Sequence, residues 1–248
     1  MIGSPAISTC PRQRRKSLEK NHPEHRKIRS FVKREGRRTP SQDRALRDLL
    51  PKFGIDHIPG PLDYSDIYAR DADTIMEIGF GMGQSLLEQA QSNPRINYLG
   101  IEVHSPGVGS LINGLQTQGL TNVRVCTEDA VEVLADKITQ DSLAGVQLFF
   151  PDPWHKKKHH KRRIVNQEFA ETILSRLKPG GFFHLATDWQ NYAEQMLQVL
   201  SAVDGFENLS EQGDYINRPD SRPLTKFERR GHRLGHGVWD LMFIRKSS

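Results

Sequence analysis

Short apolar runs alternate with segments of helical periodicity over most of this 248-residue chain. The runs are rich in β-branched and aromatic residues and predict strands at 74–78, 96–101, 123–126, 146–150, 182–186, 206–209 and 238–245. Strands that alternate with helices are typical of βα units on a parallel sheet. The pattern therefore predicts an α/β fold with helices on both faces of the sheet.

The intervening segments carry apolar stripes with the spacing of helices. One stripe ends near Gly119 and consists of Val108, Leu111, Ile112 and Leu115. Another ends at Pro179 and consists of Phe169, Ile173, Leu174 and Leu177. We further expect Ser41 to cap a short helix that stops at Pro51, and Asp188 to cap the helix that follows it.

Residues 1–40 show no sustained period and are strongly basic, with twelve Lys or Arg against three acids between 12 and 38. We interpret them as a flexible leader before one folded domain at 41–248. Such segments usually stay solvated, but they also mark nucleic-acid-binding arms. An organelle-targeting role is less favoured, because Pro5 and Pro11 interrupt an amphipathic helix.

Two cysteines, Cys10 and Cys126, cannot build a disulfide framework, and no apolar run reaches the ~18 residues needed to cross a bilayer. The cytoplasm is the compartment that fits best, and no membrane association is expected. His155 and His159 are four residues apart, but no thiolate or carboxylate completes a ligand set, so we expect no metal.

Three glycines at alternate positions follow the first predicted strand, namely Gly79, Gly81 and Gly83. They allow a tight turn and the close approach of a ligand to the main chain, beside a helix N-terminus. No Lys-Ser or Lys-Thr pair follows, so the turn is not a P-loop, and Gln84 stands where a dinucleotide fingerprint has its third glycine. Taken alone, such a turn can also be purely structural.

One acidic residue follows each of the next four predicted strands, and these are Glu102, Asp129, Asp152 and Asp188. Ligands of open parallel sheets bind outside the carboxyl ends of the strands, so these acids should share one edge. Each could be a helix cap or a solvated residue, but four in succession favour a binding site. Carboxylates attract a sulfonium and repel a pyrophosphate, so with Glu77 nearby they favour S-adenosyl-L-methionine over a nicotinamide dinucleotide. Glu102 is also placed to accept both ribose hydroxyls.

The segment 155–163 contains six Lys or Arg among nine residues and lies just after Asp152. Asp152 itself stands between Pro151 and Pro153, which restrain the backbone around it. A positioned carboxylate beside a run of cations favours a polyanionic partner over a purely solvated face.

The pattern at 77–83, together with Glu102, Asp129 and LKPGG at 177–181, resembles the class I S-adenosylmethionine methyltransferases. Three segments resemble the bacterial tRNA guanine-N7 methyltransferases within that class: RSFVKREGRRTPSQ at 29–42, FFPDPWHKKKHHKRR at 149–163 and RPLTKFERRGHRLGHGVWDL at 222–241. The resemblance implies a Rossmann-like, mostly parallel seven-stranded sheet with an antiparallel last strand. It also implies formation of N7-methylguanine in tRNA, at a variable-loop guanine.

Together, the residues and the resemblance assign expected roles. Cofactor contacts are expected from Glu77, Gly79, Gly81, Gly83, Glu102, Asp129 and Asp152. Asp152 is also the catalytic candidate. Substrate contacts are expected from Lys156, Asp188, Thr225, Lys226, Phe227 and Glu228. RNA contacts are expected from Lys158, His159, His160, Lys161, Arg162 and Arg163.

Guanine N7 carries a lone pair and no proton, so methyl transfer to it needs alignment rather than a strong base. We therefore expect Asp152 to position groups instead of removing a proton. The N1 and N2 hydrogens of guanine suit a carboxylate acceptor, for which Asp188 and Glu228 are the candidates.

Two rival functions remain. A methyltransferase that acts on an exocyclic amine carries a DPPW-like motif, which differs from the PDPW at 151–154. An RNA-binding protein without catalysis would not need the glycine turn together with all the strand-end acids. Both a monomer and a homodimer are compatible with the sequence.

Overall fold

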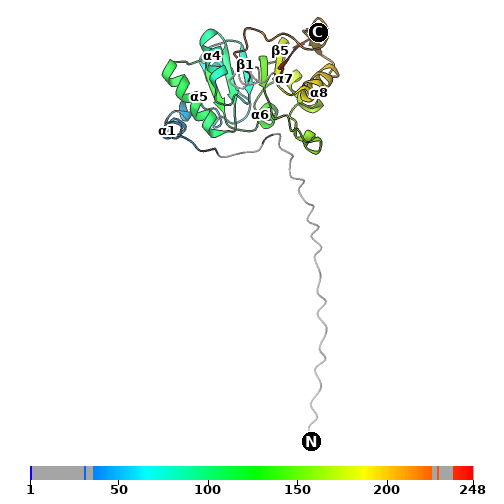
Figure 1. Ribbon diagram of the computed structural model, residues 1–248. Coiled ribbons are helices and arrows are strands. Elements are labelled where there is room, and N and C mark those ends of the chain that lie inside the picture. The colour runs from blue at the N-terminus through cyan, green and yellow to red at the C-terminus, as the bar shows by residue number, and fades with distance from the viewer. Residues whose placement is uncertain (2–30, 32–35, 225–227, 229–236, 248) are drawn as a thin grey trace.

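The computed structural model describes residues 1, 31, 36–224, 228 and 237–247, which form a seven-stranded sheet flanked by helices (Figure 1). The strands are β1 Thr74–Ile78, β2 Asn97–Ile101, β3 Val123–Cys126, β4 Leu143–Phe149, β5 Leu177–Thr187, β6 Phe206–Asn208 and β7 Trp239–Arg245. Their order in the sheet is β3-β2-β1-β4-β5-β7-β6. Strands β1 to β5 pair in parallel, whereas β7 is antiparallel to both β5 and β6. The predicted mostly parallel sheet with an antiparallel last strand is confirmed.

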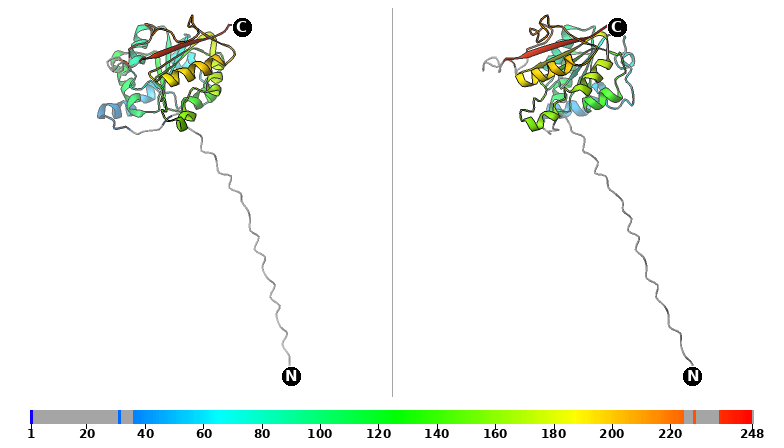
Figure 2. Two further views of the ribbon diagram at one scale, coloured as in Figure 1. Left: turned by 45° about the vertical axis from the view of Figure 1, so that its right-hand side comes forward. Right: turned by 90° about the vertical axis from the view of Figure 1, so that its right-hand side faces the viewer.

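Helices cover both faces of the sheet and enclose two apolar cores. The longer helices are α1 Pro40–Asp48, α4 Gln84–Ser92, α5 Ser105–Gln118, α6 Ala130–Asp136, α7 Gln167–Arg176 and α8 Gln190–Ser201. Successive strand residues point to opposite faces, so Tyr98 of β2 packs with α1, α4 and α5, and Leu99 packs with α6 and α7. In Figure 2 the red strand β7 lies alongside α8.

The predicted stripe on α5 is confirmed, because Val108, Leu111, Ile112 and Leu115 are all fully buried. Gly119 ends this helix in the left-handed conformation, at a φ of 65°. The helix predicted to end at Pro179 instead ends at Arg176. Leu177 starts β5 and pairs with Leu143 of β4, so strand pairing replaces the last helical turn.

Three local predictions at helix ends are wrong. Thr39, not Ser41, caps α1, because its side chain and that of Gln42 form a reciprocal capping box. Pro51 does not stop a helix but lies in the first turn of α2, Leu50–Phe53, where proline is tolerated. Asp188 does not cap α8, whose N-cap is Trp189.

A short helix, α3 Tyr64–Tyr68, precedes the first strand. The basic segment contains a 3₁₀ helix, η1 Lys157–Arg162. Most of the predicted leader lies outside the described residues, as do Thr225, Lys226 and Phe227. None of the helices in the described part of the chain has the length and apolar content needed to cross a membrane.

Candidate functional site

A cavity of about 350 Å³ lies at the carboxyl edge of the sheet. It opens where the strand order reverses, because the chain runs from β1 outward to β2 and β3 and then returns to β4 on the other side. Open α/β sheets bind ligands at this switch point. Three of the predicted acids line the cavity together, namely Glu102, Asp129 and Asp152. Apolar walls come from Ile78, Ile101, Val103, Ala130, Leu148 and Phe149.

The glycine turn between β1 and α4 presents bare backbone at this edge. Gly79 and Gly81 have φ values of 75° and 58°, which side-chain-bearing residues rarely adopt. A Cβ built on either would meet no atom within 4 Å, so the space in front of the turn is open. Gly83, at a φ of 79°, instead faces inward, where a Cβ would lie 2.7 Å from Leu111. Gly79 lines the cavity, whereas Gly83 serves packing.

Glu102 ties the glycine turn to the loop after β2. Its Oε2 accepts from the Gly81 amide at 2.9 Å and its Oε1 from the His104 amide at 2.9 Å. Each carboxylate oxygen keeps a second lone pair, so the group can still accept from a ligand hydroxyl. The N-terminus of α5 packs tightly behind it, because a Cβ on Gly107 would stand 2.0 Å from the Gly81 carbonyl oxygen.

Glu77 lies in β1 and is only 2% exposed. Burial and the nearby Glu102 charge raise the pKa of the Glu77 carboxyl to about 8. Its Oε2 accepts from Gln89 at 3.4 Å, and Gln89 in turn accepts from Gln147 at 2.7 Å. Glu77 does not line the cavity. It could therefore act on a ligand there only after the site rearranges, or through residues that lie between Glu77 and the cavity.

Asp129 has two possible tasks. It caps α6 by accepting from the Val131 amide at 3.1 Å, and its side chain also borders the cavity. The helix-cap alternative for this acid is therefore real, and it does not conflict with ligand binding because a carboxylate accepts several hydrogen bonds.

The Asp152 loop leaves β4 by a sharp turn. Phe150 and Trp154 have left-handed backbones, with φ of 51° and 48°. Phe150 remains tied to β5 because its amide donates to the Ala186 carbonyl at 2.8 Å. Asp152 is exposed beyond this anchor, between the two prolines, and faces the cavity. The left-handed backbone conformation costs energy for residues other than glycine, and it occurs often at functional sites.

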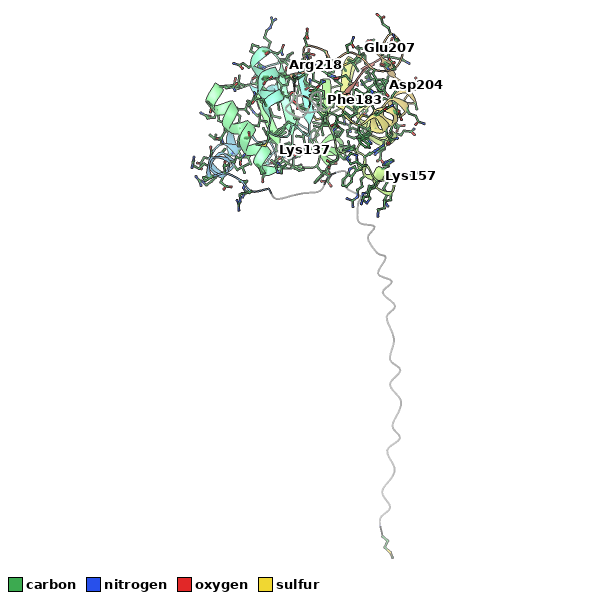
Figure 3. The ribbon with its side chains drawn as sticks, in the orientation of Figure 1. Lys137, Lys157, Phe183, Asp204, Glu207 and Arg218 are labelled. Carbon is green, nitrogen blue, oxygen red and sulfur yellow. The ribbon has the colours of Figure 1, made fainter. Side chains whose placement is uncertain are left out.

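The basic side chains after this loop differ in their exposure to solvent. Lys156, Lys158 and Lys161 are exposed, and Figure 3 shows neighbouring Lys157 at the rim of the domain, away from Asp204 and Glu207. His159 and His160 are half-buried, and the half-buried Arg162 lies over the Trp154 ring at 4.8 Å.

Arg163 differs from its neighbours because it is only 3% exposed. It donates to Pro153, Gln195 and Asn191 inside the domain. The expected phosphate contact does not fit this position, because the guanidinium faces α8 instead of solvent.

Asp188 is exposed at the carboxyl edge of the sheet, just after β5. Next to it, Trp189 is 39% exposed, and its ring lies 4.2 Å from that of His155. Trp189 was not singled out from the sequence, although its position beside a strand-end acid was a usable signal. Phe31 also lines the cavity and was not singled out.

Glu228 lies in a buried ionic cluster instead of facing solvent. Both of its oxygens accept from Arg222 at 2.6 Å, and Arg222 also donates to Asp240 at 2.7 and 2.8 Å. Asp240 further contacts the His184 ring at 2.8 Å. Burial alone would lower the pKa of Arg222, but its carboxylate partners raise it overall. Direct guanine recognition by Glu228 does not fit this arrangement, because the residue is only 2% exposed and is paired with Arg222 inside the domain.

One group of possible metal ligands occurs in the described part of the chain, formed by Asp56, Cys126 and Glu128. Asp56 accepts from the amide and hydroxyl of Thr127, and Glu128 pairs with Lys137 at 3.1 Å. Burial raises the pKa of the Cys126 thiol and disfavours the thiolate that binds metals. We therefore assign no metal to this group.

The cavity residues fit S-adenosyl-L-methionine. The volume of the cavity lies within the range of small-molecule sites, about 300–1,000 Å³. The space in front of Gly79 and Gly81 is open, and any other residue at these positions would place its side chain there. Acidic oxygens and apolar walls suit a ligand that combines a sulfonium, hydroxyl groups and an aromatic base.

A family model described as "Putative methyltransferase" matches residues 71–241. The "tRNA (guanine-N(7)-)-methyltransferase" of Shewanella woodyi is 60% identical over 89% of this chain and 92% of its own length. The enzyme of the same name from Colwellia psychrerythraea is 57% identical over 90% of this chain and 91% of its own length.

Two solved structures share the fold. The 16S rRNA methyltransferase KamB has a TM-score of 0.54 at 14% identity, over 74% of this chain and 93% of its own. A 16S rRNA (adenine(1408)-N(1))-methyltransferase from Catenulisporales acidiphilia has a TM-score of 0.51 at 14% identity, over 75% of this chain and 92% of its own.

Proposed function

This chain belongs to the tRNA (guanine-N7-)-methyltransferase family, and on that premise we propose that it transfers the methyl group of S-adenosyl-L-methionine to N7 of a guanine in tRNA. The observation that carries the proposal is one cavity, lined by a glycine turn and three strand-end acids, beside a run of exposed cations. The proposed target is a variable-loop guanine, and the proposed compartment is the cytoplasm.

The cavity acids bind and orient the methyl donor. When bound, S-adenosyl-L-methionine supplies a methyl group on a positively charged sulfur. Glu102 is held by two backbone amides, so its remaining lone pairs point in fixed directions and can accept from ribose hydroxyls. Asp129 and Asp152 add negative charge around the cavity, which favours a cationic ligand.

Asp152 acts by position. Guanine N7 carries no proton, so no residue needs to remove one before transfer. Alignment of the reacting groups can contribute about 7–11 kcal/mol to lowering the barrier. The prolines on both sides and the left-handed Phe150 restrain the loop that carries Asp152.

The role of Asp152 can be tested with Asp152→Asn, which keeps the shape of the side chain and removes its charge. We expect a reduced rate and an unchanged form of the pH–rate profile. An acidic-limb pKa that is present in the wild type and absent from the variant would instead identify Asp152 as a general base.

Asp188 is the proposed acceptor for the Watson–Crick edge of guanine. It is exposed at the same edge of the sheet, and a carboxylate can accept from both N1 and N2. Glu228 supports the site indirectly, because it pairs with Arg222, which also donates to Asp240 of β7. Trp189 offers a stacking surface for a base.

The exposed cations beside the cavity bind tRNA phosphates. Lys156, Lys158 and Lys161 lie on the surface next to the Asp152 loop, with the half-buried Arg162 beside them. Phosphate contacts set the register of RNA on the protein and make affinity depend on salt. Here they would bring the target guanine to the cavity.

Product mapping tests the proposed function. The purified protein is incubated with methyl-labelled S-adenosyl-L-methionine and unmodified tRNA, and the RNA is then cleaved chemically at N7-methylguanine. Labelled tRNA cleaved at one variable-loop guanine is the expected result. Label on an exocyclic amine would favour the rival methyltransferase, and binding without labelling would favour the non-catalytic RNA-binding protein.

A further inference from the structure

We propose that Arg163 is a positioning residue, which holds the Asp152 loop on helix α8 and makes no contact with RNA phosphates. This inference rests on the function proposed above. Arg163 is only 3% exposed, and its guanidinium contacts Pro153, Gln195, His160 and Asn191 inside the domain.

The guanidinium spans the gap between the loop and the helix. Its Nε donates to the Pro153 carbonyl at 2.8 Å. On the helix side, Nη1 donates to Gln195 Oε1 at 2.6 Å and Nη2 to Asn191 Oδ1 at 3.0 Å. Gln195 and Asn191 are one helical turn apart, so they present their oxygens on the same face of α8.

An aromatic ring supports the same guanidinium. The Tyr192 ring lies 4.6 Å from the guanidinium carbon, and its hydroxyl accepts from the Val165 amide at 3.3 Å. Tyr192 therefore fixes both the side chain of Arg163 and the backbone that follows it. The planar fork of arginine can use the ring face and three separate acceptors at once.

These contacts place an anchor on each side of Asp152. Before it, the Phe150 amide is bonded to the Ala186 carbonyl of β5. After it, the Pro153 carbonyl is bonded to Arg163. Loss of the second anchor removes the hydrogen bond that holds the Pro153 carbonyl after Asp152. A displacement of Asp152 by about 1 Å can lower the rate by about a hundredfold.

The neighbouring cations provide an internal contrast. Lys161 is exposed and Arg162 is half-buried over Trp154, whereas Arg163 turns inward. Burial lowers the pKa of Arg163, as expected for a guanidinium that has left water. One basic segment thus contains residues that face RNA and one residue that faces the loop.

The test compares Arg163→Met and Arg163→Lys with two control variants. Arg70→Met removes an arginine that donates to Pro94, Ile96 and Asn97, at the opposite edge of the sheet. It controls for lost stability. Lys161→Met removes an exposed cation and controls for lost phosphate contact.

The measurements are kcat, the KM for tRNA at several salt concentrations, and Tm. For Arg163→Met we expect kcat to fall by about 30- to 100-fold, while the KM for tRNA and its salt dependence stay within about twofold. Arg163→Lys should recover part of kcat, because an ammonium can still reach one acceptor. Arg70→Met should lower Tm with little change in kcat.

Two results would overturn the inference. A raised KM for tRNA with a weaker salt dependence, as expected for Lys161→Met, would make Arg163 a phosphate ligand. A loss of kcat no larger than that of Arg70→Met at equal loss of Tm would make it merely structural. A wild-type protein that forms no N7-methylguanine would refute the proposed function, on which the inference depends.

Discussion

Replacing Glu77 with Gln should make the protein more stable at neutral and alkaline pH. Glu77 is 2% exposed, and burial followed by the Glu102 charge raises its pKa from 4.5 to about 8. Between about pH 4.5 and pH 8 the folded protein therefore retains a proton that the unfolded chain has already lost. Gln has the shape of the neutral acid and can still accept the hydrogen bond from Gln89.

The direction of the effect follows from proton linkage. Below the ordinary value of 4.5, the carboxyl is neutral in both states, so pH has no effect through this group. As pH rises towards about 8, the unfolded state gains stability from ionisation and the free energy of unfolding falls. Each pH unit corresponds to about 1.4 kcal/mol, so the change from about pH 5 to pH 8 approaches 4 kcal/mol.

Urea unfolding of the wild type and Glu77→Gln at several pH values measures this difference. Other titrating groups cancel, because they are shared by both proteins. Glu88→Gln is the control, since Glu88 is exposed on the neighbouring helix α4. If the difference in free energy of unfolding between the wild type and Glu77→Gln changes by less than about 1 kcal/mol from about pH 5 to pH 8, then Glu77 is not held neutral by burial.

Three further outcomes are expected. Lys158→Ala with Lys161→Ala should weaken tRNA binding and reduce the salt slope by about one per lost phosphate contact, and an unchanged slope would remove that assignment. Gly107→Ala should weaken cofactor binding, measured by calorimetry, by roughly tenfold, because its Cβ would displace the glycine turn at a cost of about 1–3 kcal/mol. Gly119→Ala, at the C-cap of the same helix, should bind the cofactor normally. Arg222→Met should lower the free energy of unfolding by about 3–5 kcal/mol in urea titrations, because it removes the guanidinium that pairs with two buried acids; a loss below about 1 kcal/mol would contradict that burial.

The sequence by itself determined the strands, the parallel sheet and the edge at which the site forms. The stripe on α5 predicted its buried face because helical spacing places those residues together whatever surrounds them. Glu102, Asp129 and Asp152 follow strands of one parallel sheet, so their meeting at one cavity required only the strand assignments.

Only the tertiary structure decided which charged residues face solvent and which are paired. In the sequence, Arg163 and Arg162 are adjacent arginines of one basic segment and predict the same exposed position. In the structure, acceptors from α8 hold Arg163 inside the domain. Glu228 was expected at the substrate, but it is buried inside the domain and paired with Arg222. Local patterns reflect neighbours along the chain, whereas burial and hydrogen-bond partners come from segments far apart in sequence, so these assignments exist only once the chain has folded.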